Sequence, residues 1–156
     1  MSKEIAVLGA GAIGSSVSAD LTKAGYDVTV IDQWPAQVEA LKSSGLRIQM
    51  PDGEVRVPIR ALHLCDLSSA NLEFDFVFLT VKSNDDRWMA EFIKPYLKPN
   101  GVITCIQNGM NDDSIAGLGN APYARGKPPQ KWGFASRFTP GTMPACPAGV
   151  LHATAK

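Results

Sequence analysis

The sequence lacks an excess of charge of either sign. Its 156 residues include 15 Lys and Arg and 15 Asp and Glu, so the formal net charge is zero, and no basic stripe with interleaved aromatic residues occurs. Such a balance provides no electrostatic field that would attract nucleic acid or an anionic membrane. We therefore expect neither nucleic acid nor a membrane surface among the partners of this protein.

Cysteines and long apolar runs are also scarce. Cys65, Cys105 and Cys146 are odd in number and far apart, which fits neither a disulfide framework nor a zinc ligand set. No apolar run approaches the ~18–20 residues that span a bilayer, and the run at residues 4–8 is too short for a signal peptide. The sequence predicts reduced thiols and no metal site in a soluble, cytoplasmic protein.

The chain does contain enough apolar residues for a core. They make up 45% of the sequence, at a length typical of one domain. The character of the sequence changes near residue 116, because from Gly117 onward prolines and glycines interrupt every candidate helix or strand. We predict a folded domain over residues 1–116 and a poorly ordered Pro/Gly-rich tail over residues 117–156.

The most informative feature is a glycine-rich turn at residues 9–14. It follows an apolar run at residues 4–8 and leads into a helical pattern at residues 13–24. A second strand, at residues 27–31, ends on Asp32, at about the ~20-residue distance expected of a dinucleotide-binding βαβ unit. We therefore predict that the turn contacts a dinucleotide through Gly9, Ala10, Gly11, Ala12, Ile13 and Gly14.

Each glycine of this turn has a separate predicted role. Gly9 permits the tight turn, Gly11 lacks the Cβ that would keep a pyrophosphate from the backbone, and Gly14 lets the helix pack closely on the sheet. The unpaired N–H groups and positive dipole end of the helix would face the phosphates. The alternative is a glycine turn that serves only strand-to-helix packing.

Asp32 bears on the choice of cofactor. Its carboxylate would accept hydrogen bonds from the adenosine ribose hydroxyls and would repel the 2′-phosphate of NADP, so NAD is favoured. An alternative role for Asp32 is a helix cap before Trp34 and Pro35. For Trp34 we expect ordinary packing, with a position beside the adenine as the alternative.

Further apolar runs complete a sheet. Continuous apolar segments at residues 76–81 and 102–106 predict buried parallel strands, the first of them beside residues 4–8. Alternating segments on either side of residues 51–53 predict a hairpin, and residues 99–101 predict a turn.

Two further helices are expected between these strands. One begins near Pro35 and ends near Gly45, and the other is capped by Ser83 or Asn84. The alternation of strands and helices predicts an α/β, Rossmann-like fold with a doubly wound, mostly parallel sheet.

Polar residues follow the carboxyl ends of the predicted central strands, where ligands of such sheets bind. Lys82 would meet an anionic substrate or ribose oxygens, and the alternative is a solvated lysine paired with Asp85 and Asp86. Asn108 would bind substrate or nicotinamide through its amide, and the alternative is a turn with Gly109. His63 and His152 have no carboxylate or cysteine at triad or ligand spacing, so we expect both to be structural or exposed.

Four segments together resemble the N-terminal half of the ketopantoate reductase family, the 2-dehydropantoate 2-reductases. They lie at residues 9–14, 30–35, 80–83 and 106–110, and the resemblance covers roughly residues 5–115. The glycine motif is shared by many dehydrogenases, whereas the Val-Lys and Gln-Asn-Gly-Met segments are more specific to this family.

The resemblance implies hydride transfer from NAD(P)H to the keto carbon of a small 2-keto acid, as in pantothenate biosynthesis. It implies that Lys82 and Asn108 line the cofactor and substrate cleft as catalytic and cofactor-binding residues. Many family members prefer NADPH and carry a basic residue at the end of the second strand. Asp32 and Gln33 depart from that pattern.

The resemblance also implies a helical second domain that supplies a catalytic lysine and a glutamate. A chain of this length has no room for it, so we interpret residues 117–156 as a truncated or aberrant remnant, for example from a frame-shifted gene. We expect cofactor binding more firmly than turnover, and self-association into a homo-oligomer through the apolar face left uncovered. A noncatalytic NAD(H)-binding sensor is the main alternative, and a methyltransferase is a more distant one.

Overall fold

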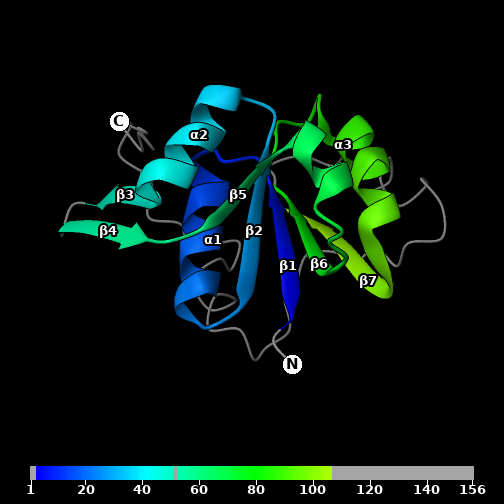
Figure 1. Cartoon of the computed structure of the whole chain (residues 1–156), viewed down its shortest axis with the longest axis horizontal. Coiled ribbons are helices and arrows are strands. Elements are labelled where there is room, and N and C mark those ends of the chain that lie inside the picture. Colours follow the sequence, from blue (N-terminus) through cyan, green and yellow to red (C-terminus); the bar gives the residue numbers. More distant parts are fainter. Residues whose placement is uncertain (1–2, 51–52, 107–156) are drawn as a thin grey trace, which may run out of the picture.

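A five-stranded parallel sheet is the centre of the molecule (Figure 1). The computed structural model describes residues 3–50 and 53–106, apart from the side chain of Met50. The order of the strands is β5-β2-β1-β6-β7. Their bounds are β1 (Glu4–Leu8), β2 (Asp27–Asp32), β5 (Arg60–His63), β6 (Phe74–Leu79) and β7 (Leu97–Cys105). The predicted Rossmann-like α/β fold is confirmed, and the tail at residues 117–156 lies outside the described residues.

Helices cover both faces of the sheet because its central strand is apolar on both. Ile5 and Val7 of β1 pack in one cluster with Val17 of the first helix, whereas Ala6 and Leu8 pack in another with Met89. Figure 1 shows α1 and α2 on one side of the strands and α3 on the other. The bounds are α1 (Ala12–Lys23), α2 (Pro35–Ser44) and α3 (Asp86–Ile93), with short 3-10 helices η1 (Leu64–Ser69) and η2 (Lys94–Tyr96).

The predicted hairpin forms a separate two-stranded sheet. Its strands β3 (Leu46–Met50) and β4 (Gly53–Val57) pair antiparallel, and both contribute to the cluster that buries Val38 and Leu41 of α2. The hairpin therefore packs beside α1 and α2 without joining the central sheet (Figure 1).

The turn predicted at residues 99–101 is wrong, because these residues lie inside β7. Leu97 pairs with Phe74, but the next paired residue of β7 is Val102, opposite Phe76. The intervening residues are accommodated by a shift in register, and a Cβ on Gly101 would approach the Phe74 carbonyl oxygen to 2.8 Å. Proline and glycine here mark an irregularity within an edge strand rather than its start.

An ion cluster joins three strands beside this irregularity. The Lys98 ammonium lies 2.9 Å from a Glu4 carboxylate oxygen and 3.0 Å from Asp75 Oδ2, which also accepts the Glu4 N–H at 2.9 Å. Partial burial alone would raise the pKa of Asp75, but the Glu4 N–H and the Lys98 ammonium outweigh it and lower that pKa below its ordinary value. Since the folded pKa lies below the unfolded one, this carboxylate stabilises the fold above the unfolded pKa, and the contribution disappears as the pH falls through the folded pKa.

We expect the Asp75→Asn variant to be slightly less stable than the parent at pH 7 but equal to it in strong acid. The amide keeps an acceptor for the Glu4 N–H and loses only the charge pair with Lys98, which is partly exposed and worth about 0.5 kcal/mol. Urea unfolding at pH 7 and below about pH 3 measures the difference. A difference that persists in acid would contradict this role for the charge.

Candidate functional site

The turn between β1 and α1 is built by two of its three glycines. Gly9 has a φ of +100°, which side-chain-bearing residues rarely adopt, and its N–H donates to the Ile31 carbonyl oxygen at 2.9 Å. A Cβ on Gly14 would lie 1.9 Å from the Gly9 carbonyl oxygen. The tight turn and the close helix packing predicted for these residues are both confirmed.

Gly11 differs from Gly9 and Gly14 because no contact among the described residues requires it to be glycine. Its φ of −70° and ψ of −174° suit any residue, and a Cβ built there meets no atom within 4 Å. It is the N-cap of α1, no side chain caps this end, and the first turn holds no acidic residue. Open space therefore adjoins the start of a helix, an arrangement that suits an anion.

Asp32 is buried and holds the turn in place. Only 6% of the residue is exposed. Its Oδ2 accepts the Ala10 N–H at 2.5 Å and its Oδ1 accepts the Trp34 N–H at 2.8 Å. The N-cap of α2 is Trp34 and not Asp32. Asp32 therefore stabilises the start of that helix only through its hydrogen bond with the Trp34 N–H. A carboxylate has about four acceptor sites, so two remain for a ligand's hydroxyl groups.

Thr80 is a site residue that the sequence analysis missed. Its hydroxyl lies 2.8 Å from the Leu8 carbonyl oxygen and 2.9 Å from that of Gly9, to which it donates. Its backbone N–H also donates to the Leu8 oxygen at 2.9 Å. The signals for this role were a threonine at the end of an apolar strand expected beside residues 4–8, and its place in the segment 80–83 that resembles the family.

Lys82 lies in the turn between β6 and α3, near the carboxyl ends of the central strands. The Asp85 N–H donates to the Lys82 carbonyl oxygen at 2.8 Å, which closes the turn. Asp85 is the N-cap of α3, so the predicted caps Ser83 and Asn84 are wrong. The Lys82 side chain is exposed, and within residues 3–50 and 53–106 its ammonium has no ion pair with either neighbouring aspartate. Its charge is thus available to an anion.

Asn108 cannot be placed in this site. It lies outside the described residues, together with Gln107, Gly109 and Met110. Its predicted roles in binding substrate and nicotinamide therefore stay predictions.

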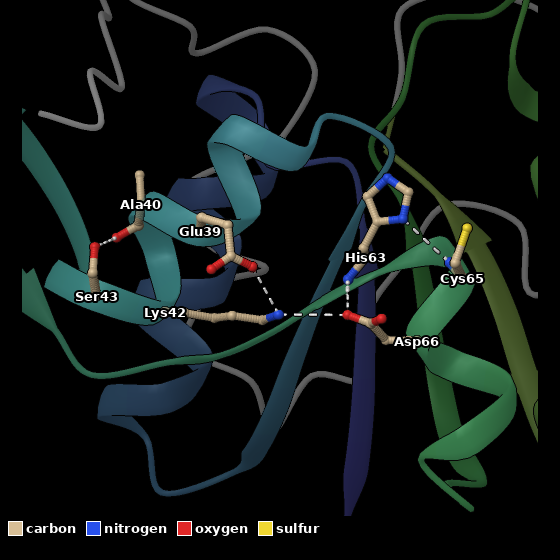
Figure 2. A network of polar contacts seen from close by, with 7 residues as sticks. All are labelled: Glu39, Ala40, Lys42, Ser43, His63, Cys65 and Asp66. Atoms are coloured by element: carbon tan, nitrogen blue, oxygen red, sulfur yellow. Dashed lines mark hydrogen bonds and ion pairs between the residues drawn. The ribbon is translucent and has the colours of Figure 1, made fainter.

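His63 lies at the end of β5, where it is paired with Asp32 of β2. Its Nε2 is 2.9 Å from the Gln33 carbonyl oxygen, and its Nδ1 accepts the Cys65 N–H at 3.3 Å, so the expected structural role fits. Figure 2 shows His63 next to Asp66, which the Lys42 ammonium links to α2. Both ring nitrogens of His63 are engaged within the protein.

Trp34 does not pack as expected. It is 67% exposed, more than Ile13 (41%) or Trp88 (40%), the other large apolar residues exposed in the described part of the chain. The prediction of ordinary packing for this indole is therefore wrong. Trp34 instead presents a large apolar surface two residues after Asp32.

Within the described ranges, no group of three or more His, Cys, Asp or Glu residues could hold a metal ion, and neither Cys65 nor Cys105 forms a disulfide bond there. None of the helices in this part of the chain combines the length and the hydropathy needed to cross a membrane.

Comparisons with known proteins give a consistent result. The family described as "Ketopantoate reductase PanE/ApbA" matches residues 5–118. A 2-dehydropantoate 2-reductase of Lactococcus lactis is 34% identical over 112 residues, which are 71% of this chain and 36% of that protein. The chain thus spans about a third of the length of the curated relatives it matches.

Solved structures agree with this similarity. A PanE/ApbA family ketopantoate reductase from Ralstonia eutropha is 30% identical with a TM-score of 0.68, over 77% of this chain and 39% of that one. D-mandelate dehydrogenase in complex with NADH and anilino(oxo)acetate is 26% identical with a TM-score of 0.67, over 73% of this chain and 36% of that one.

Proposed function

The chain belongs to the ketopantoate reductase family, and from that premise we propose that it binds a nicotinamide dinucleotide for the reduction of a small 2-keto acid to the 2-hydroxy acid. The bound cofactor would supply the hydride that reaches the keto carbon. We assign its binding to the domain predicted over residues 1–116.

The observation that carries this proposal is the open helix start at Gly11. The turn is built with Gly9 and Gly14, yet a Cβ on the third glycine would meet no atom of the described residues within 4 Å, which leaves room for a ligand. The oxygens of a pyrophosphate there would accept hydrogen bonds donated by the unpaired N–H groups at the positive end of α1. The motif residues Ala12 and Ile13 begin that helix, whereas the N–H of Ala10 is already taken by Asp32.

The other candidate site residues lie at the carboxyl ends of different strands and would bind different parts of the cofactor and substrate. Asp32, at the end of β2, would accept the hydroxyls of the adenosine ribose. Lys82, beyond β6, would face the nicotinamide ribose or the carboxylate of the keto acid, where its positive charge is complementary. We propose that Asn108 completes that end with an amide that orients substrate or nicotinamide.

Cofactor titration followed by an assay tests the proposal. We expect the 156-residue chain to bind NADH in calorimetry or fluorescence titrations. Turnover of ketopantoate or another small 2-keto acid would then support a reductase. Binding without turnover would favour a noncatalytic NAD(H)-binding module, and failure to bind either NADH or NADPH would overturn the proposal.

Asp32 is proposed to favour NADH over NADPH. Its buried carboxylate would lie against the 2′-phosphate, so we expect NADPH to bind at least about tenfold more weakly. The Asp32→Asn variant should bring the ratio of the two dissociation constants close to one. Damage to the turn affects both cofactors alike and cancels in this ratio. A ratio unchanged by the substitution would remove Asp32 from cofactor selection.

A further inference from the structure

The order of the strands determines which loops lie beyond the ribose site. A dinucleotide at the carboxyl edge of this sheet straddles β1 and β6, where the strand order reverses. Asp32 lies on the β2 side of that point, and the next strand outward is β5. A base attached to the ribose at Asp32 must therefore lie near the segments that follow β2 and β5.

Those two segments are Gln33–Trp34 and the turn that begins at His63. They are tied together, because His63 Nε2 bonds the Gln33 carbonyl oxygen at 2.9 Å. Both nitrogens of the His63 ring are engaged, so this ring offers no hydrogen bond to the edge of a base. An aromatic side chain in these segments would instead bind the face of the base.

Trp34 has the chemistry for such a contact. Its backbone is fixed by the bond from its N–H to Asp32 Oδ1 and by the Val38 N–H, which donates to its carbonyl oxygen at 3.1 Å. The indole itself makes no hydrogen bond or ring contact within the described ranges, whereas Trp88 donates its Nε1–H to Asp85. Trp34 thus follows Asp32, the proposed ribose acceptor, with a hydrogen-bonded backbone and a mostly exposed indole that makes no hydrogen bond or ring contact of its own among the described residues.

We propose that the Trp34 indole stacks on the base of the adenosine half of the cofactor. This inference rests on the proposed function and specifies how that site binds one end of its ligand. Stacking on an aromatic side chain contributes about 1–3 kcal/mol per base, which is roughly 5- to 150-fold in affinity. The adenosine half would then be bound by Asp32 at the ribose and by Trp34 at the base.

Binding of the two halves of the cofactor, measured separately, distinguishes the Trp34 contact from the rest of the site. ADP-ribose carries the adenine and no nicotinamide, and nicotinamide mononucleotide carries the reverse. We expect Trp34→Ala to weaken ADP-ribose binding about tenfold in calorimetry, and Trp34→Phe to restore most of that loss. Binding of nicotinamide mononucleotide should be unchanged in both variants.

Trp88→Ala is the matched control, because Trp88 is also exposed but lies on α3, on the other side of the sheet. Equal ADP-ribose affinity in the parent, Trp34→Ala and Trp88→Ala proteins would overturn the stacking contact and leave the proposed function intact. So would an equal loss for both halves of the cofactor in Trp34→Ala, since that would indicate general damage. A parent chain that binds neither NADH nor ADP-ribose would instead refute the proposed function itself.

Discussion

The Gly14→Ala variant is expected to be less stable than the parent by about 3 kcal/mol or more. The new Cβ would lie 1.9 Å from the Gly9 carbonyl oxygen and 2.5 Å from Thr80 Oγ1. Neither neighbour can give way easily, because Gly9 is held at a φ of +100° and the Thr80 hydroxyl holds the turn. The start of α1 would have to move by about 1 Å, which would break the close packing of helix and sheet.

Urea unfolding followed by circular dichroism measures this loss. The matched control is Gly11→Ala, which adds the same methyl group three residues earlier in a position with no atom within 4 Å. A Gly14→Ala protein as stable as the control would show that the turn yields more easily than its contacts indicate.

The Gly11→Ala variant is expected to fold normally and to bind cofactor poorly. Its backbone angles suit alanine, and the entropy lost from the unfolded chain offsets the poorer capping, so stability should change by less than about 1 kcal/mol. The methyl group would occupy the space assigned to the pyrophosphate. We expect NADH binding to weaken about 100-fold, the equivalent of one to two lost charge-assisted hydrogen bonds.

Calorimetric titration of NADH into both alanine variants makes the comparison. Gly11→Ala should retain the unfolding midpoint of the parent and lose affinity, so that stability and binding separate. Unchanged NADH affinity in a folded Gly11→Ala protein would contradict a pyrophosphate above this residue. Lost stability in the same protein would show that the open space is not open in solution.

Together the two variants test whether the glycine motif both shapes the turn and leaves room for a ligand. Gly9 and Gly14 shape the turn through contacts inside the protein, and Gly11 leaves room for something outside it. A turn that served packing alone would use the third glycine only as the N-cap of α1. This difference is the physical basis for choosing a ligand site over the packing-only alternative.

The sequence alone determined the fold class, because the relevant signals are local. Continuous apolar runs specify strands that are buried on both faces, and a glycine turn followed by an acidic strand end specifies the first βαβ unit. Pro35 and Gly45 mark the two ends of α2, as the structure confirms. The candidate cofactor residues at 9–14 and at Asp32 were named from such short-range patterns.

Only the tertiary structure decided which residues from different strands contact one another. Thr80 reaches the glycine turn from 71 residues away, and the Asp32 carboxylate bonds Ala10 across 22 residues. No spacing rule along the chain encodes such contacts, since they depend on which strands become neighbours. The exposure of Trp34 and the register shift in β7 were missed for the same reason: burial and pairing are properties of the packed sheet, whereas periodicity is a property of the chain.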